Sequence, residues 1–299
     1  MAFESLAERV LAFQRAENPV YARFAQTGRF LPVDAFKHQA VATFPPDSAE
    51  RVFTSSGTGS GVRARHFVRH LSFYDASIDA GFQERFGPGP FRVLAHLPHY
   101  AEDSSLVYMV RRLIDRFGAP GSGFFLGDSV LLEQALANEG APILLFGAAF
   151  GLLDLAEARS FSLPADARLI ETGGMKTHRR SVSREELHRL LSEGFGVSRE
   201  QIWSEYGMCE MLSQAWSRGE EPLIPPPWMR VEIFDPEDPL RPLERGRPGL
   251  LAVLDLANVH SASALLTQDR AVISGQGFFV LGRMSGAELR GCNHLMESL

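Results

Sequence analysis

The strongest constraint on the fold is a regular alternation of short apolar segments and amphipathic helical segments in the middle of the chain. Apolar segments that predict strands occur at residues 91–97, 142–146, 168–171 and 202–205. Helical patterns separate them, most clearly at residues 105–117 and 148–158. A helix between successive strands indicates parallel strands whose helices cover the faces of the sheet. We therefore predict an α/β fold with a mostly parallel sheet and flanking helices.

The pattern changes after Pro225-Pro226-Pro227, and we expect a β-rich subdomain from there on. The expected strands, joined by turns rich in Gly, Pro and Asp, are residues 229–234, 250–256, 271–274 and 278–281. The triple proline reads as the connection between two regions. The predicted division is an α/β region at residues 1–224 and a β-rich subdomain at residues 228–299.

Charge and cysteine content exclude several classes of protein. The 36 acidic and 30 basic residues give a net charge of −6, which disfavours electrostatic capture of nucleic acid. Two cysteines, Cys209 and Cys292, are too few for a disulfide framework or a four-thiolate zinc site. The N-terminal apolar stretch carries charges, and no segment of about 18 apolar residues occurs. We therefore expect no integral membrane association and a cytoplasmic location.

The first motif that could carry chemistry is the segment Phe53–Gly61, in which hydroxyl side chains and glycines fill most positions. Glycine allows backbone N–H groups to approach an anion, and hydroxyl groups add donors, as a phosphate site requires. The segment lacks the Walker pattern. A flexible, solvated loop is the alternative.

The second motif, Ser204–Glu210, directly follows a predicted strand. Its carboxylate at Glu210 could hold Mg²⁺ beside phosphates, and its aromatic ring at Tyr206 could stack on a purine. An ordinary connection with a solvated acid is the alternative.

The third motif places Asp269 ahead of Gly277-Phe278 and Gly282-Arg283. An aspartate can accept hydrogen bonds from both hydroxyls of a ribose, and an arginine can donate to the same sugar. A plain salt bridge between the two side chains is the alternative.

Taken in this order, the three motifs resemble the adenylate-forming superfamily, which includes acyl-CoA synthetases and peptide-synthetase adenylation domains. A narrower resemblance, to the LuxE-type acyl-protein synthetases, rests on residues 98–100, 104–110, 172–176, 204–208 and 286–292. The ending Gly286-Ala-Glu-Leu-Arg-Gly-Cys292 is the most specific of these segments.

The resemblance implies ATP and Mg²⁺ as cofactors and assigns roles to particular residues. Glu210 would hold Mg²⁺, Tyr206 would lie against adenine, and Asp269 and Arg283 would bind ribose. Lys176 would reach a phosphate or carboxylate, as a possible substitute for the lysine of a C-terminal lid domain that we do not expect in a chain ending at Leu299. The remaining implied ATP-site residues are Thr54, Ser55, Ser56, Gly57, Thr58 and Gly59, with Arg63 and Arg65 after them, and Gly173 and Gly174.

The two cysteines receive different roles. The resemblance makes Cys292 the acyl acceptor; nine extended residues beyond Arg283 reach about 30 Å, and the neighbouring Arg290 would favour the thiolate. Cys209 stands where the family pattern usually has Thr, and we expect a small buried side chain there.

The predicted function is therefore ATP-dependent activation of a carboxylic acid, expected to be a fatty acid, followed by transfer to Cys292 as a thioester. The family implies a partner reductase or acyltransferase. Two alternatives remain open: a ligase that delivers the acyl group to coenzyme A or a carrier protein, and a non-catalytic module that only binds adenylate.

Overall fold

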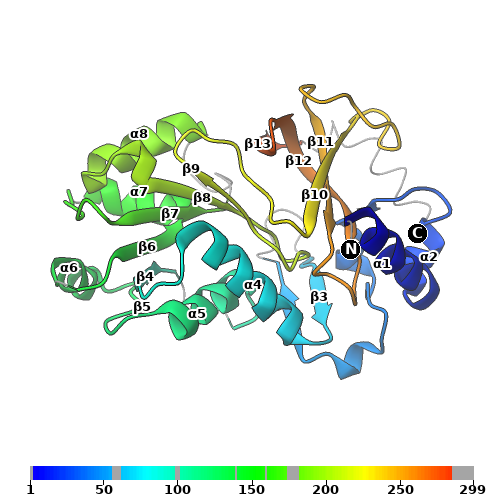
Figure 1. Ribbon diagram of the computed structural model, residues 1–299, viewed down its shortest axis with the longest axis horizontal. Helices are drawn as coiled ribbons and strands as arrows, with labels where there is room; N and C mark the ends of the chain where they lie inside the picture. The colour runs from blue at the N-terminus through cyan, green and yellow to red at the C-terminus, as the bar shows by residue number, and fades with distance from the viewer. Residues whose placement is uncertain are drawn as a thin grey trace.

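The computed structural model describes residues 3–55, 62–97, 102–138, 140–158, 160–173 and 182–284. Within these residues two larger sheets lie side by side, with a small hairpin below them (Figure 1). The six-stranded sheet with its helices forms one half of the view. The five-stranded sheet with the N-terminal helices forms the other.

The six-stranded sheet confirms the predicted α/β class. Its strands run in the order β5-β4-β6-β7-β8-β9, and every neighbouring pair is parallel except β8 and β9. The strands are β4 (Arg92–His96), β5 (Gly123–Phe124), β6 (Ile143–Ala148), β7 (Arg168–Thr172), β8 (Ile202–Tyr206) and β9 (Ala215–Arg218). The antiparallel β9 was not predicted.

Helices cover both faces of this sheet. On one face α4 (Leu71–Phe86) and α5 (Ser105–Phe117) form a core with Phe146 and Ile170. On the other, α6 (Ser129–Ala137), α7 (Ala149–Ala158) and α8 (Arg184–Phe195) pack on Leu145 and Leu169. Burial on both faces explains why these strands are continuously apolar in sequence.

Local capping accounts for where two of the helices begin. The Oγ atom of Ser104 accepts from the backbone N–H of Val107 at 3.3 Å, before α5. The Oγ atom of Ser183 accepts from the N–H of Glu186 at 3.2 Å, before α8. Each hydroxyl satisfies an N–H group that has no partner within its helix. Helix α8 runs to Phe195 and stops before Gly196, which has a φ of 63°.

The five-stranded sheet is the predicted β-rich region, joined by a short N-terminal strand. Its strands are β1 (Leu31–Pro32), β10 (Met229–Phe234), β11 (Gly249–Asp255), β12 (Ala264–Ser274) and β13 (Gly277–Arg283). The β10-β11-β12-β13 pairs are antiparallel, and β1 lies parallel to β12. Strand β12 begins at Ala264, seven residues before the predicted start at Ala271.

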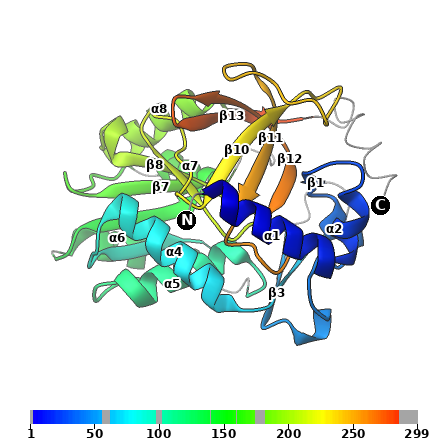
Figure 2. The same cartoon turned by 45° about the vertical axis from the view of Figure 1, so that its right-hand side comes forward.

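The N-terminal helices belong to the core of this second sheet. Helix α1 (Phe3–Glu17) lies across β10, β11 and β12 in Figure 2, and α2 (Pro19–Phe24) follows it. Val10, Leu11 and Phe24 share one buried cluster with Leu251 and Val253. The division at residues 224 and 228 stays a prediction.

A two-stranded hairpin and three short helical segments complete the described elements. Strands β2 (Arg51–Thr54) and β3 (Arg65–Val68) pair antiparallel and flank the predicted phosphate loop. The short helical segments are α3 (Ala35–His38) and the 3₁₀ turns Pro46–Ser48 and Arg199–Gln201. No helix among the described residues is long and apolar enough to span a membrane.

Candidate functional site

The structure brings together the aromatic ring, acid and arginine that the sequence motifs singled out. The phenol O–H of Tyr206, at the end of β8, donates to Asp269 Oδ2 at 2.8 Å. Asp269 on β12 and Arg283 on β13 are cross-strand partners, with 3.9 Å between Asp269 Oδ1 and Arg283 Nε. Residues from both sheets therefore meet at one carboxylate.

Backbone and ring contacts hold this group in place. The N–H of Asp269 donates to Thr267 Oγ1 at 3.1 Å, and that hydroxyl donates to the Leu251 carbonyl at 2.8 Å. The ring of Phe278 meets the Tyr206 ring edge-on, with centroids 5.4 Å apart. Burial, and then the Asp269 charge, raise the pKa of Tyr206 well above its usual value. The phenol therefore stays protonated and remains a donor.

Glu210 lies buried in the same region. Burial raises the pKa of Glu210 to about 7. The positive charges of Arg283 and Lys37 lower this pKa, and the negative charge of Asp34 raises it. Its backbone carbonyl accepts from Asn258 Nδ2 at 2.8 Å. A cation bound at this carboxyl would favour its ionised form.

The predicted Mg²⁺ ligand, Glu210, is a single buried carboxylate. Among the described residues, no group of three or more His, Cys, Asp or Glu side chains is arranged to hold a metal ion. Mg²⁺ at nucleotide sites is typically bound by one or two carboxylates together with phosphate oxygens. A single carboxylate at Glu210 fits that arrangement.

The base of the predicted phosphate loop is closed by Asp103, which the sequence motifs did not indicate. The Thr54 hydroxyl donates to Asp103 Oδ2, and the Thr54 N–H donates to the Asp103 carbonyl at 2.8 Å. Arg63 Nη1 lies 2.9 Å from the same carboxylate oxygen. The Thr54 hydrogen bond and the Arg63 charge lower the pKa of Asp103. Asp103 lies between residues 98–100 and 104–110 of the narrower resemblance, which assigned it no role.

Ser55 and Arg65, both predicted ATP-site residues, also make contacts within this hairpin. The Oγ atom of Ser55 accepts from the Ala64 N–H at 2.9 Å, so this hydroxyl closes the hairpin. Arg65 is exposed, and its guanidinium lies 5.5 Å from the ring centre of Phe67. Because side chains alternate along a strand, Arg65 is on the opposite face of β3 from His66.

His66 is a second residue that the motifs missed, and it connects the hairpin to the Glu210 turn. Its Nδ1 atom lies 2.8 Å from the Cys209 carbonyl, and its Nε2 atom lies 3.1 Å from Asn258 Oδ1. Burial lowers the pKa of His66 to about 4. Burial also raises the pKa of the Cys209 thiol well above its usual value, so this thiol is protonated and a poor nucleophile.

The carboxyl ends of β7 and β8 lie side by side, because the two strands are parallel neighbours. Gly173 follows β7 at a φ of +84°, a conformation that favours glycine. The Thr172 hydroxyl donates to Glu205, a buried residue whose pKa burial raises to about 7. Glu205 lies inside the second motif, yet its burial is a tertiary effect that the motif does not reveal.

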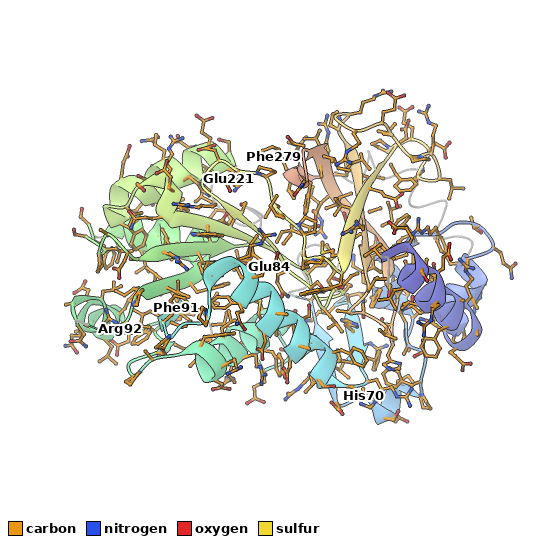
Figure 3. The ribbon with its side chains drawn as sticks, viewed as in Figure 1. His70, Glu84, Phe91, Arg92, Glu221 and Phe279 are labelled. Atoms are coloured by element: carbon orange, nitrogen blue, oxygen red, sulfur yellow. The ribbon has the colours of Figure 1, made fainter. Side chains whose placement is uncertain are left out.

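The two halves are also joined beside this site, at Phe278. Figure 3 labels Glu221, in the segment after β9, and Phe279, on β13, on the two sides of this junction. Backbone hydrogen bonds of 2.8 and 3.0 Å join Leu223 to Phe278 there. The remaining predicted site residues lie outside the described residues: Ser56, Gly57, Thr58, Gly59, Gly174, Lys176 and Cys292.

Comparison with known proteins points to one family. The family model described as "Acyl-protein synthetase, LuxE" matches residues 115–299. The long-chain-fatty-acid–luciferin-component ligase of Vibrio harveyi is 26% identical over 293 residues, which cover 87% of this chain and 75% of that protein.

Solved structures with the same fold match most of this chain but only part of their own chains. ATP-bound MatB from Rhodopseudomonas palustris superimposes with a TM-score of 0.58 at 19% identity, covering 81% of this chain and 49% of MatB. The 2-hydroxyisobutyryl-CoA ligase in complex with 2-HIB-AMP and CoA gives 0.67 at 15% identity, with 95% and 68% covered. This chain thus spans about half the length of MatB, and at these identities the likeness is one of fold.

Proposed function

Because this chain belongs to the LuxE family of acyl-protein synthetases and is therefore a ligase, we propose that it activates a carboxylic acid with ATP and then acylates Cys292. The observation that carries the proposal is the meeting of Tyr206, Asp269 and Arg283 beside the buried Glu210. Aromatic, acidic and basic groups at one place suit a nucleotide, which has a base, a ribose and phosphates.

In the first step, an oxygen of the carboxylate attacks the α-phosphorus of ATP. The bond from that phosphorus to its bridging oxygen breaks, and pyrophosphate leaves with the electron pair. Asp269 and Arg283 bind the ribose, and Tyr206 flanks the adenine while its hydroxyl fixes Asp269. The loop of residues 54–59, with Gly173 and Gly174, surrounds the rest of the nucleotide. Glu210 would hold Mg²⁺, which when bound would supply positive charge to the phosphates.

In the second step, the thiolate of Cys292 attacks the acyl carbon, and AMP leaves. The thiol of Cys209, a partly exposed residue whose pKa burial raises, is unsuited to this role, which supports Cys292 as the acceptor. Lys176 contacts a phosphate or the carboxylate. The Vibrio harveyi relative is named for a long-chain fatty acid, so we propose that this chain also activates a long-chain fatty acid. We propose that the acyl group passes on to a reductase or acyltransferase partner, as the family resemblance implies.

Intact-mass spectrometry after incubation with ATP, Mg²⁺ and a panel of fatty acids tests the proposal. We expect an acyl adduct that hydroxylamine removes and that the Cys292→Ser variant does not form. An adduct that survives in Cys292→Ser, or no adduct with any acid, would contradict it.

Two other outcomes would favour the alternatives. Full turnover of Cys292→Ser with coenzyme A or a carrier protein would identify a ligase that acts on a separate thiol. Measurable affinity for ATP without acid-dependent exchange of pyrophosphate into ATP would identify a non-catalytic binding module.

A further inference from the structure

Lysine is rare in this chain, and one of its lysines, Lys37, lies near the site. The sequence contains two lysines, Lys37 and Lys176, against 28 arginines. A lysine ammonium is a compact point charge with three donors, whereas a guanidinium is a planar fork. Lys37 occupies α3, a segment that none of the nucleotide motifs includes.

Three contacts fix α3 beside those motifs. The Val33 N–H donates to the Leu266 carbonyl at 3.0 Å, continuing the pairing of β1 with β12. The side-chain amide of Gln268, the residue before Asp269, donates to Asp34 Oδ2. The ring of Phe36 meets His66 edge-on at 5.6 Å between centroids. Since His66 also binds the Cys209 carbonyl, α3 lies between the Asp269 strand and the Glu210 turn.

Lys37 is held toward this region by a neighbouring acid. Its Nζ atom lies 2.6 Å from Asp34 Oδ1, and the two side chains are 28% and 25% exposed. The other oxygen of Asp34 is occupied by Gln268, so the carboxylate is anchored from two sides. One donor of the Lys37 ammonium faces Asp34, and two remain for ligand oxygens.

We propose that Lys37 binds phosphate oxygens of ATP beside Glu210, and that Asp34 is the residue that positions it. This inference rests on the proposed function. During adenylation negative charge grows on the departing pyrophosphate as its bond to the α-phosphorus breaks. The Lys37 ammonium, placed at the phosphates, stabilises that charge.

The competing interpretation is a surface ion pair between residues i and i+3, which would have little effect on ligand binding. An ATP analogue whose γ-phosphate carries an acyl group distinguishes the two. Such a compound acylates lysine amines that contact the ATP phosphates. The protein has two lysines, so peptide mass spectrometry can assign each acylated site.

We expect acylation of Lys37 that excess ATP with Mg²⁺ suppresses, and reduced acylation in Asp34→Ala. In parallel, Lys37→Met should raise the KM for ATP in pyrophosphate exchange roughly ten- to hundredfold, the range for a hydrogen bond to a charged group. Lys37→Arg should recover only part of this loss. The control Arg29→Met removes a charge from the same N-terminal segment, at an exposed ion pair with Glu232, and should leave the KM within about twofold.

The results separate this inference from the proposed function. Acid-dependent exchange in the wild type, with no labelling of Lys37 and an unchanged KM in Lys37→Met, would overturn the role of Lys37 alone. Labelling of Lys37 that ATP suppresses, without any exchange, would support the contact and contradict the proposed reaction.

Discussion

At the scale of single residues, the hydroxyl of Tyr206 contributes more than its ring alone predicts. The sequence suggested an aromatic surface for adenine, whereas the structure also ties the phenol to Asp269 at 2.8 Å. Tyr206→Phe keeps the ring and removes this bond. We expect a KM for ATP about three- to tenfold higher, with kcat changed less, because one hydrogen bond contributes about 1 kcal/mol. Asp269→Ala should have the larger effect in the same pyrophosphate-exchange assay.

Glu205 makes stability depend on pH with a defined sign. Burial raises its pKa from 4.5 to about 7. Below pH 4.5 the carboxyl is protonated in folded and unfolded chains alike, and as the pH rises toward 7 and above the folded chain must bury a charge. Its contribution to stability is therefore lost as the pH rises. Glu205→Gln should gain stability over the wild type by about 1–3 kcal/mol at pH 8 and little at pH 5.

Urea unfolding at the two pH values measures this difference. Glu84→Gln, at an exposed position on α4 labelled in Figure 3, is the matched control and should show no such pH dependence. An equal effect of Glu205→Gln at both pH values would show that burial does not perturb this carboxyl.

At the scale of elements, the parallel strands and their helices were predictable, but the connections that build the site were not. Strand β4 and helix α5 lie where the apolar periods predict them. Burial in the core produces a clear local pattern of apolar residues in both segments. The hairpin β2–β3 and the strand β9 are short and mixed in polarity, so local patterns do not separate them from loops.

Asp103 illustrates an interaction that depends on this arrangement of elements. It joins the segment before α5 to the hairpin at Thr54 and Arg63. Asp103→Ala should loosen the base of the loop and raise the KM for ATP about three- to tenfold, while the melting temperature falls little because the carboxylate is half-exposed. Asp47→Ala, at an exposed acid between α3 and β2, is the control and should change neither quantity. An unchanged KM in Asp103→Ala would separate this clamp from nucleotide binding.

At the scale of the whole molecule, long-range polar contacts attach α1 to the five-stranded sheet. The side-chain amide of Gln14 donates to the Asn258 and Val259 carbonyls at 2.9 Å, and its oxygen accepts from the Ser263 N–H at 3.0 Å. Gln14→Ala should lower the free energy of unfolding by about 2–4 kcal/mol, because buried backbone groups lose their partners. Urea denaturation measures this, with Gln26→Ala at an exposed site as control. A loss equal to that of the control would mean that these contacts contribute nothing net.

This attachment also marks where prediction from sequence stops. An amphipathic period at the N-terminus predicts a helix, which α1 confirms, but no local signal says which sheet its apolar face meets. The same holds for His66, whose hydrogen-bond partners Cys209 and Asn258 are more than 100 residues away in the sequence. Motifs gave the acids and the arginine of the site, and tertiary packing gave the residues between them.

The distance along the chain between Gln14 and Ser263, 249 residues, has a consequence for biosynthesis. Helix α1 leaves the ribosome first, whereas the strands that bury its apolar face are translated near the end of this sequence. At a synthesis rate of about 5–20 residues per second, the apolar face of α1 is exposed for roughly 10–50 s before the strands that cover it are made. The six-stranded sheet can assemble during this interval from neighbouring segments. Until the last strands emerge, the apolar face of α1 stays exposed on the nascent chain, where chaperones can bind it.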